Sequence, residues 1–199
     1  MGTDIDVRVL KGIKRGKKGD CVRTNFDQYG LRYPELIRAD LSALPLRFDS
    51  CIDGILCDPP YGIRAGARKT CTHVHENPPL EVREGHIPRT EVYDPDDVIV
   101  DLLDCAARTL VLGGRIAYLL PTFGEHGEKE VPEHPCMELL ANAEEKLQTS
   151  VSRRLITMRK TREYEKDKRE EYKRFCRESI ERNHISYAHL KEFVYSKKE

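Results

Sequence analysis

The sequence predicts an α/β fold built around a mostly parallel sheet, and two stretches lead to this prediction. Residues 53–57 form a short, mostly apolar run that suits a strand buried inside a sheet. The next four residues, Asp-Pro-Pro-Tyr at 58–61, end that strand, because neither proline can donate a hydrogen bond to a sheet. Residues 98–112 carry apolar side chains at helical spacing and lead through two glycines into a second apolar run at 115–120. A strand, a long helix and a further strand in this order are typical of α/β proteins.

Composition limits the classes of protein to consider. Lys and Arg together number 34, as do Asp and Glu, so the overall charge offers no general attraction for nucleic acid and any such contact needs local patches. Charged residues make up 34% of the chain and the mean hydropathy is −0.61, which predicts a solvated, charge-rich segment. The seven cysteines include no Cys-x-x-Cys pair, which indicates reduced thiols in an intracellular protein. Neither a signal peptide nor a long apolar span is present, so no contact with a membrane is predicted.

Weaker signals predict the remaining elements. Short helices are predicted over residues 7–18, 22–29 and 134–142. The long helix is predicted to begin at Asp94-Pro95, since proline and acidic residues suit a first turn. A strand over 153–159 is predicted to pair antiparallel with 144–148. The densely charged segment 161–182 is predicted to be a protruding helix or to become ordered by a partner.

The turn at 58–61 is the first candidate site. It presents a carboxylate, a carbonyl and an aromatic ring at the carboxyl end of a strand, the edge where open α/β sheets bind ligands. It is similar to the Asp/Asn-Pro-Pro-Tyr/Phe motif of S-adenosylmethionine-dependent methyltransferases that modify exocyclic or amide nitrogens. The catalytic candidates are Asp58, Pro59, Pro60 and Tyr61. From the residues alone, a proline-stiffened turn without a function is the alternative.

The chemistry explains these residue types. An exocyclic amine is a poor nucleophile because its lone pair is delocalised into the ring. The carboxylate of Asp58 and the carbonyl of Pro59 can accept both of its N–H bonds, which localises the lone pair and orients it. The ring of Tyr61 can stack on the extruded base. No metal and no covalent intermediate are required.

Two further acidic positions resemble the cofactor site of these methyltransferases. Gly-Thr-Asp-Ile-Asp at 2–6 is similar to the end of the second strand of their sheet, where an acidic residue binds the ribose hydroxyls; Asp4 is the first choice and Asp6 the second. Residues 35–40 predict a strand that ends in a carboxylate, which in many of these enzymes contacts the adenine amine. The cofactor-binding candidates are Asp4, Asp6, Asp40, Leu41 and Asp58. From the residues alone, the alternative for 2–6 is a frayed acidic terminus. The alternative for 35–40 is a carboxylate in the turn that ends a strand.

The region 63–94 has no sustained periodicity and contains three prolines, which predicts a substrate loop after the catalytic turn. Its tentative RNA-binding residues, which would meet phosphates, are Arg64, Arg68 and Lys69. A nearby cluster consists of Cys71, His73, His75 and His86. Its spacing matches no standard zinc pattern, so no metal site is predicted.

Taken together, six motifs resemble one family. They are Gly-Thr-Asp-Ile-Asp at 2–6, Asp-Pro-Pro-Tyr-Gly-Ile-Arg at 58–64, Leu-Val-Leu-Gly-Gly-Arg at 110–115, Leu-Pro at 120–121, His-Pro-Cys at 134–136 and Ser-Arg-Arg-Leu-Ile-Thr-Met at 152–158. The chain resembles, over roughly 2–160, the catalytic domain of the eukaryotic tRNA guanosine-10 2-amino methyltransferases. The resemblance implies a class I, Rossmann-like fold and transfer of a methyl group from S-adenosylmethionine to the guanine 2-amino group in tRNA. It also implies a cytoplasmic heterodimer with a small zinc-binding activator subunit.

The family pattern further sets the expected domain limits. We expect a methyltransferase domain over 1–161, lacking the first strand and glycine-rich turn that family members carry, and a charged C-terminal helical extension over 162–199. Two alternative functions remain. The chain could be a catalytically inactive fragment that acts only in partner or RNA binding, or a DNA amino-methyltransferase, against which the motif at 152–158 argues.

Overall fold

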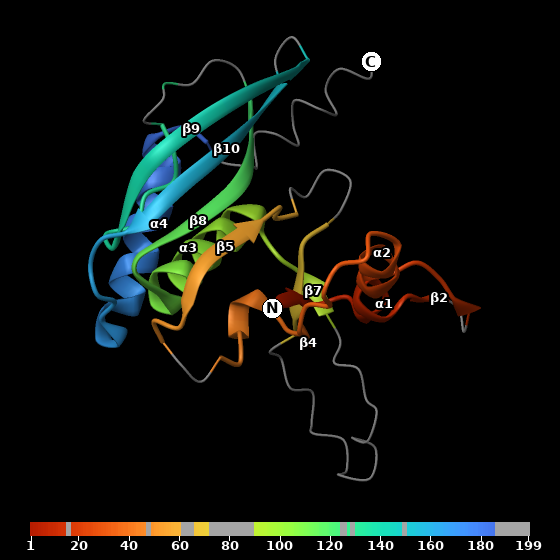
Figure 1. Ribbon diagram of the computed structural model, residues 1–199. Helices are drawn as coiled ribbons and strands as arrows, with labels where there is room; N and C mark the ends of the chain where they lie inside the picture. The colour runs from red at the N-terminus through yellow and green to blue at the C-terminus, as the bar shows by residue number, and fades with distance from the viewer. Residues whose placement is uncertain are drawn as a thin grey trace. The chain divides into compact units, whose positions relative to one another are not determined.

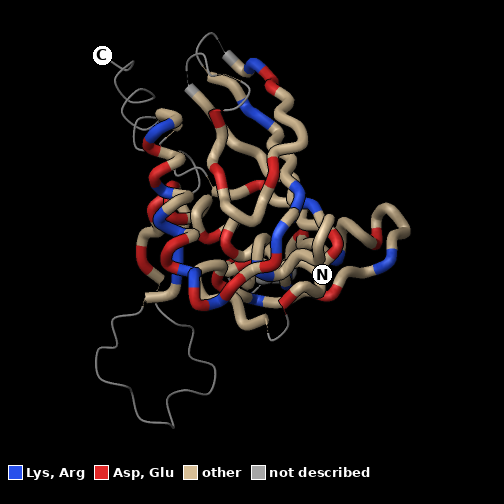
Figure 2. Tube along the Cα trace, turned by 90° about the vertical axis from the view of Figure 1, so that its left-hand side faces the viewer, with Lys and Arg blue, Asp and Glu red and all other residues tan. Residues whose placement is uncertain are grey.

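The computed structural model describes residues 1–14, 17–46, 49–60, 66–71, 90–123, 127, 130–148 and 151–185 (Figure 1). The chain forms two compact units, each of which is described by itself. Unit 1 comprises Met1–Pro45 and Arg68–Glu91, and unit 2 comprises Leu46–Ala67 and Val92–Glu199. Acidic and basic residues are interleaved along the described chain (Figure 2). None of the helices in the described part combines the length and apolar character needed to cross a membrane.

Unit 2 contains a four-stranded sheet in the order β5-β8-β10-β9 (Figure 1). Its strands are β5 (Ile52–Cys57), β8 (Leu110–Phe123), β9 (Met137–Gln148) and β10 (Val151–Lys160). The strand β5 is parallel to β8, whereas β10 is antiparallel to both β8 and β9. The α/β class and the predicted strands at 53–57, 115–120 and 153–159 are confirmed, although antiparallel pairs make up the larger part of this sheet.

The predicted helix over 134–142 is wrong, because this segment enters β9. Residues from Met137 to Gln148 pair along the whole of β10, so the predicted antiparallel partner 144–148 is confirmed and begins earlier than expected. The local run Met-Glu-Leu-Leu-Ala has a good helical propensity. Pairing with a neighbouring strand outweighs that preference, since it satisfies the same backbone groups and buries Met137 against the core.

The helix α3 (Pro95–Thr109) begins where the sequence predicts. Asp94 is its N-cap and accepts a hydrogen bond from the backbone N–H of Asp96 at 2.9 Å, and Pro95 occupies the first turn. The helix ends at Thr109 rather than 112, because Leu110 already pairs with Ile52 in the sheet.

The two glycines after α3 form an irregularity inside β8 instead of ending the helix. The register shifts between the pairs Ile52–Leu110 and Gly54–Arg115, which accommodates the extra residues. Gly113 has a φ of 81°. A Cβ on Gly114 would lie 2.9 Å from the carbonyl oxygen of Val111, so a larger residue does not fit there.

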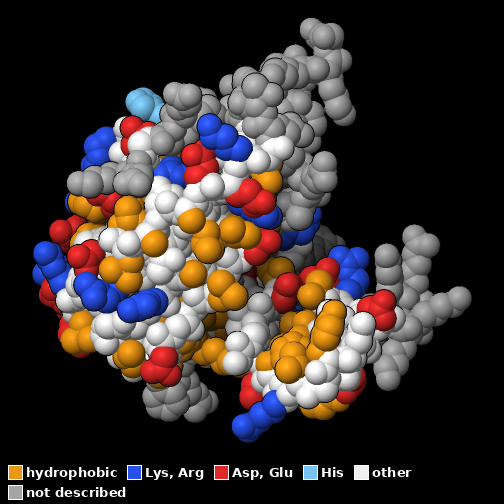
Figure 3. All heavy atoms as spheres, turned by 45° about the horizontal axis from the view of Figure 1, so that its top comes forward, with side chains coloured by type: hydrophobic (Ala, Val, Ile, Leu, Met, Phe, Trp, Pro, Cys, Tyr) orange, Lys and Arg blue, Asp and Glu red, His pale blue; other side chains and the backbone are white. Residues whose placement is uncertain are grey.

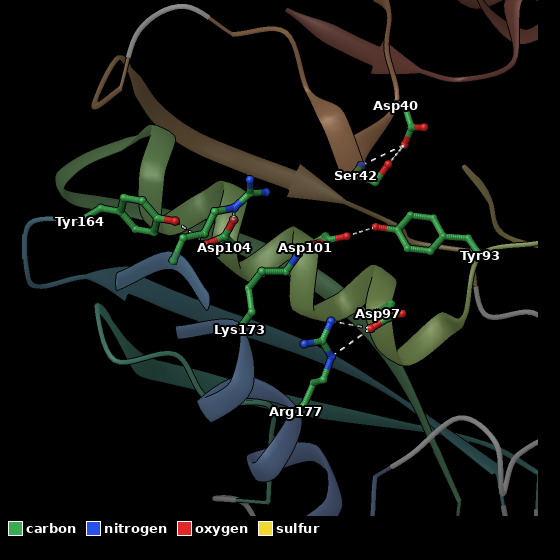
Figure 4. A network of polar contacts seen from close by, with 10 residues as sticks. Asp40, Ser42, Tyr93, Asp97, Asp101, Asp104, Tyr164, Lys173 and Arg177 are labelled. Carbon is green, nitrogen blue, oxygen red and sulfur yellow. Dashed lines mark hydrogen bonds and ion pairs between the residues drawn. The ribbon is translucent and has the colours of Figure 1, made fainter. Parts of the chain in front are cut away.

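The helix α4 (Arg169–Arg182) follows the short 3-10 helix η3 (Lys166–Lys168) and packs against α3. The structure thus differs from the predicted protruding segment. The residues that α4 buries are Tyr172, Cys176, Ser179 and Ile180. This apolar stripe is narrow, and complementary charges on the two helices extend the contact (Figure 4).

These charges form an ion-pair ladder between α3 and α4. Its three rungs are Asp97–Arg177 at 3.0 Å, Asp101–Lys173 at 2.5 Å and Asp104–Arg169 at 3.0 Å. Each set of residues recurs every three or four positions and therefore lies along one face of its helix. Tyrosine hydroxyls complete two rungs: Tyr93 donates to Asp101, and Tyr164 donates to Asp104 at 2.6 Å (Figure 4).

The helices α3 and α4 cover one face of the sheet (Figure 1). Along β10 the residues alternate between fully buried and partly exposed, and the buried ones include Ile156 and Met158. The ammonium of Lys160 is also buried; it donates to the carbonyl of Leu110 at 2.8 Å and to Ser50 Oγ at 3.1 Å. On the exposed surface, hydrophobic and charged side chains are mixed (Figure 3).

Unit 1 is built on a parallel pair, β1 (Gly2–Asp4) and β4 (Leu36–Arg38). Its other elements are α1 (Val7–Lys11), β2 (Ile13–Lys14), β3 (Lys17–Lys18), α2 (Val22–Gln28), the 3-10 helix η1 (Leu41–Ala43), β6 (Arg68–Thr70) and β7 (Thr90–Val92). The helix predicted over 22–29 and the strand predicted at 35–40 are confirmed. The helix predicted over 7–18 is only partly right, because Gly12 adopts a left-handed conformation with φ 66° and ends α1.

Candidate functional site

The Asp-Pro-Pro turn stands directly at the carboxyl end of β5. Asp58 is exposed, the ring of Pro59 is buried and Pro60 is exposed. The last residue of β5, Cys57, pairs with Tyr118 of β8, and β8 runs on beyond this level to Phe123. The turn therefore lies at the carboxyl edge of a parallel pair, where α/β sheets bind ligands. Tyr61 lies outside the described residues.

The thiol beside the turn does not compete with the Asp58 carboxylate for chemistry. Burial, together with the negative charge of Asp58, raises the pKa of Cys57 to about 11. The thiol thus stays protonated at neutral pH, and only the thiolate is a good nucleophile. The candidate groups for chemistry at this turn are the carboxylate of Asp58 and the backbone carbonyls.

In unit 1 two carboxylates follow parallel strands and reach a common edge. Asp4 is the last residue of β1 and pairs with Arg38 of β4; Asp40 follows two residues later. The backbone N–H of Ala39 donates to the carbonyl of Asp4 at 3.1 Å, which extends this pairing toward Asp40. Both side chains are carboxylates, which only accept hydrogen bonds. They therefore suit a ligand that donates them from hydroxyl or amine groups.

The carboxylate of Asp40 is held by its own loop. Its Oδ1 accepts from the backbone N–H and the hydroxyl of Ser42, at 2.9 and 2.8 Å (Figure 4). Its Oδ2 accepts from the N–H of Thr70 in β6. Burial acts to raise the pKa of Asp40, but these hydrogen bonds outweigh it and hold the pKa below its ordinary value. Leu41 follows as the first residue of η1 and is half-buried.

The structure separates the two acidic candidates near the N-terminus. Asp6 caps α1, accepts from the N–H of Arg8 at 2.8 Å and forms a two-point ion pair with the same guanidinium. This hydrogen bond from Arg8 lowers the pKa of Asp6. Within the described residues, the carboxylate of Asp4 accepts from the N–H of Asp6 at 2.7 Å. In the described residues, Asp4 thus accepts fewer hydrogen bonds than Asp6.

We expect Asp40→Asn to remove an acid-sensitive part of the free energy of unfolding. The folded-state pKa lies below 3.8, so the carboxylate stabilises the fold above about pH 4, and this contribution is lost as the pH falls through the lowered pKa. Denaturant titrations from pH 7 to pH 3 should show a difference between variant and wild type that narrows at acid pH. Asp20→Asn, at an exposed position of unit 1, is the control. A difference that does not change with pH would contradict this account.

The tentative RNA-binding residues have local partners. The guanidinium of Arg68 donates to the hydroxyl and carbonyl of Thr90, at 2.6 and 2.8 Å, and Lys69 lies 3.6 Å from the carboxylate of Glu91. Both side chains thus join β6 to β7. Arg64, His73, His75 and His86 lie outside the described residues. Within the residues described, no three His, Cys, Asp or Glu side chains are grouped as metal ligands.

Sequence reasoning missed one buried charged side chain of the sheet. Arg154 of β10 is 2% exposed and lies on the core face of its strand. A signal for it was present, because alternation along β10 places Arg154 on the same face as Ile156, Met158 and Lys160. It donates to the carbonyls of Glu130 at 2.7 Å and Gly127 at 3.0 Å and to the side-chain oxygen of Asn142 at 3.0 Å.

The α/β fold, with the Asp-Pro-Pro turn at the carboxyl end of a parallel strand, defines a domain of the class I, Rossmann-like methyltransferase type. Comparison with known proteins narrows this class. The tRNA (guanine(10)-N(2))-methyltransferase TRMT11 of Homo sapiens is 39% identical over 179 residues, which cover 82% of this chain and 39% of that protein. The TRMT11 of Dictyostelium discoideum is 41% identical over 171 residues, covering 82% and 33%. Over most of its length the chain is similar to these methyltransferases, and it spans between a third and two fifths of theirs.

Two other comparisons add little. No protein-family model matches the chain. Among solved structures, a putative DNA modification methylase from Thermus thermophilus is 17% identical, with a TM-score of 0.29 over 65% of this chain and 53% of that one. That similarity is too low to establish a shared fold.

Proposed function

We propose that the protein containing this chain transfers a methyl group from S-adenosylmethionine to the exocyclic 2-amino group of guanosine 10 in tRNA. The observation that supports it most is the Asp58-Pro59 turn at the carboxyl end of β5, in a chain whose relatives are named for this reaction. The turn supplies two acceptors, and the amine to be methylated offers two N–H donors.

In this proposal the chain acts by positioning and by charge. The carboxylate of Asp58 and the carbonyl of Pro59 accept the two N–H bonds of the guanine amine and direct its lone pair toward the methyl carbon. As the bond from nitrogen to the methyl carbon forms, the bond from that carbon to the sulfonium sulfur breaks, and positive charge develops on the nitrogen. The fixed negative charge of Asp58 stabilises this charge until the nitrogen releases a proton to water. The rings of Pro59 and Pro60 restrict the backbone, so that both acceptors are held before the substrate arrives. Tyr61 stacks on the base.

Unit 1 contains groups that suit the cofactor. S-adenosylmethionine supplies an electrophilic methyl group, and its ribose hydroxyls and adenine amine are hydrogen-bond donors. We infer that Asp4 accepts from the ribose hydroxyls and Asp40 from the adenine amine, with apolar Leu41 beside the ring. The hydrogen bonds that Asp40 accepts from Ser42 and Thr70 fix the direction of its carboxylate. Asp6 is a weaker candidate because Arg8 occupies it.

The remaining assignments extend the family resemblance. Arg64, Arg68 and Lys69 would contact tRNA phosphates, the last two from the β6–β7 pair. A small zinc-binding activator subunit would form a heterodimer with the protein, and the complex would act in the cytoplasm.

The assay measures methyl transfer by the protein as the cell produces it, using labelled S-adenosylmethionine and unmodified tRNA. We expect N2-methylguanosine at position 10, and no product when position 10 of the tRNA is changed to adenosine. Transfer to a DNA duplex instead of tRNA would indicate a DNA amino-methyltransferase. Binding of tRNA without cofactor binding or transfer would indicate an inactive binding protein. Titration calorimetry with S-adenosylmethionine identifies this last case, because an inactive binding protein would show no heat of cofactor binding.

A further inference from the structure

Unit 2 contains a cavity whose lining is mostly charged. Its volume is about 280 Å³. Pockets that hold drug-sized ligands begin at about 300 Å³, so this one suits a small molecule. The lining combines three cations, one carboxylate and two less polar side chains, and all of them belong to unit 2: Leu46, Asp49, Arg108, Tyr164, Lys166 and Arg169.

The cavity lies at the amino edge of the parallel strands, away from the Asp-Pro-Pro turn. Asp49 precedes β5 by three residues, and Arg108 is in the last turn of α3, just before β8. The N–H of Ser50 donates to the carbonyl of Arg108 at 3.0 Å, so these two segments run side by side. The six residues of β5 span about 20 Å between this edge and the turn. The cavity is therefore a separate site and includes none of the catalytic candidates.

The ion pairs at the cavity leave one guanidinium without a hydrogen-bond acceptor. Lys166 pairs with Asp49 at 2.6 Å, and Arg169 pairs with Asp104, which is 5% exposed, at 3.0 Å. Arg108 lies 3.8 Å from the Asp49 carboxylate, and its enclosed Nε donates no hydrogen bond among the residues that the structure describes. An enclosed donor without an acceptor costs free energy, so a ligand that accepts from it is favoured.

The charges favour an anion with more than one negative charge. Three cations and one carboxylate give the lining a surplus of two positive charges. Behind the lining, the carboxylate of Asp104 and the buried ammonium of Lys160, which donates to Ser50 Oγ, offset each other. The amino end of α4 and the carboxyl end of α3 also lie here, and their dipoles act in opposite directions. The side chains therefore decide the sign of the local potential.

Among common biological anions, a phosphate monoester matches these features. It carries about −1.5 to −2 charges at neutral pH, whereas a carboxylate or a phosphodiester carries one. Its three terminal oxygens can accept from several cations at once, and guanidinium groups bind phosphate through two parallel hydrogen bonds. The ring of Tyr164 and the side chain of Leu46 supply an apolar wall for the group that carries the phosphate. The hydroxyl of Tyr164 is already directed to Asp104 (Figure 4).

We propose that this cavity binds a phosphate monoester, with Arg108, Lys166 and Arg169 as its binding residues. The monoester is either a small metabolite or the 5′-phosphate end of an RNA, since both present the same group. Asp49 keeps Lys166 at the cavity, and its own negative charge reduces the affinity for the anion. The site does not depend on methyl transfer, so it stands or falls separately from the proposed function.

Titration calorimetry of the whole chain with phenyl phosphate tests the proposal. We expect saturable binding of one molecule per chain. Arg108→Met should raise the Kd at least about tenfold, because charge-assisted hydrogen bonds are lost. Lys166→Met should raise it severalfold and covers the case in which the first variant fails to fold, since Lys166 is 71% exposed. Arg174→Met is the matched control: Arg174 is also on α4, is 72% exposed, pairs with Glu178 and is not part of the lining, so the Kd should not change.

A variant with the opposite expected effect distinguishes ligand binding from a purely structural role of these charges. Asp49→Asn removes the negative charge of the lining and should lower the Kd for phenyl phosphate severalfold, although it also removes an ion pair of the fold. Phenol, which lacks the phosphate, should not bind. The proposal is overturned if the wild type binds no phenyl phosphate up to about 10 mM. It is also overturned if folded Arg108→Met and Lys166→Met variants bind it as well as the wild type does.

Transfer RNA with and without its 5′-phosphate separates the two sources of the monoester. If the RNA end is the source, removing this phosphate should raise the Kd for tRNA severalfold in the wild type and have no effect in Arg108→Met. Equal affinities of the wild type for both forms, together with binding of phenyl phosphate, would assign the site to a small metabolite. A chain that binds phenyl phosphate here but transfers no methyl group would overturn the proposed function alone.

Discussion

We expect Asp58→Ala to slow methyl transfer to tRNA by orders of magnitude while the affinity for S-adenosylmethionine is retained. The variant loses the carboxylate that accepts an N–H bond of the amine and stabilises its developing charge. Removing one preorganised group of this kind lowers kcat by roughly 10²- to 10³-fold. Asp58→Asn should be less impaired than Asp58→Ala, because an amide keeps one acceptor oxygen. The side chain of Asp58 is exposed, so neither variant should unfold.

Single-turnover rates measure the methyl-transfer step, and calorimetry measures the affinity for the cofactor. Together they distinguish a loss of transfer from a loss of cofactor binding. Asp53→Ala is the matched control: Asp53 is an exposed aspartate of the same strand β5, at its amino end. It should retain wild-type rates. Near-normal turnover by Asp58→Ala would exclude the assigned role. Equal loss in the alanine and asparagine variants would instead indicate that the carboxylate acts as a base rather than as a hydrogen-bond acceptor.

The second large effect concerns stability. Asp101→Ala should lower the free energy of unfolding by about 3–5 kcal/mol, because it leaves a mostly buried ammonium without its counter-charge. Asp101 and Lys173 are 10% and 15% exposed, and the buried hydroxyl of Tyr93 also loses its acceptor. Asp97→Ala, at the outer rung of the same ladder, should cost less than about 1 kcal/mol. Asp97 and Arg177 are 38% and 47% exposed, so water replaces the lost partner.

Urea unfolding of the three proteins measures both values. Adding Lys173→Met to Asp101→Ala should recover part of the lost free energy, because the pair is then replaced by apolar groups and no buried charge is left unpaired. Equal losses at the two rungs would show that burial does not set the strength of this ladder. Failure of the double variant to recover stability would show that the lost Tyr93 hydrogen bond or a cavity dominates.

The features that sequence predicted correctly are those whose signals are local. The start of α3 at Asp94 and the end of β5 at Asp58 depend on proline, on capping side chains and on apolar periodicity, which act over a few residues. For the same reason the Asp-Pro-Pro turn could be recognised as a candidate site before its surroundings were known.

Where the prediction failed, distant residues decide the outcome. The segment after 134 has a good helical propensity, yet it forms β9 because β10 supplies a partner along its whole length. For the charged segment that contains α4, the sequence predicts a protruding helix or a segment ordered by a partner, because few of its residues are apolar. It packs because three of its cations meet three carboxylates of α3, an arrangement that appears only when the helices are side by side (Figure 4).

By itself, the sequence determined the α/β class, the strand-ending Asp-Pro-Pro turn and the resemblance to tRNA guanine methyltransferases, because composition and short-range spacing carry this information. Only the tertiary structure decided which groups are available for chemistry. It shows that the carboxylate of Asp40 accepts from the N–H of Thr70, and that the buried Arg154 donates to the carbonyl of Glu130. Whether a polar side chain can bind a ligand depends on the hydrogen-bond partners that folding brings to it. For Asp40 and Arg154 these partners include residues that are distant in the chain.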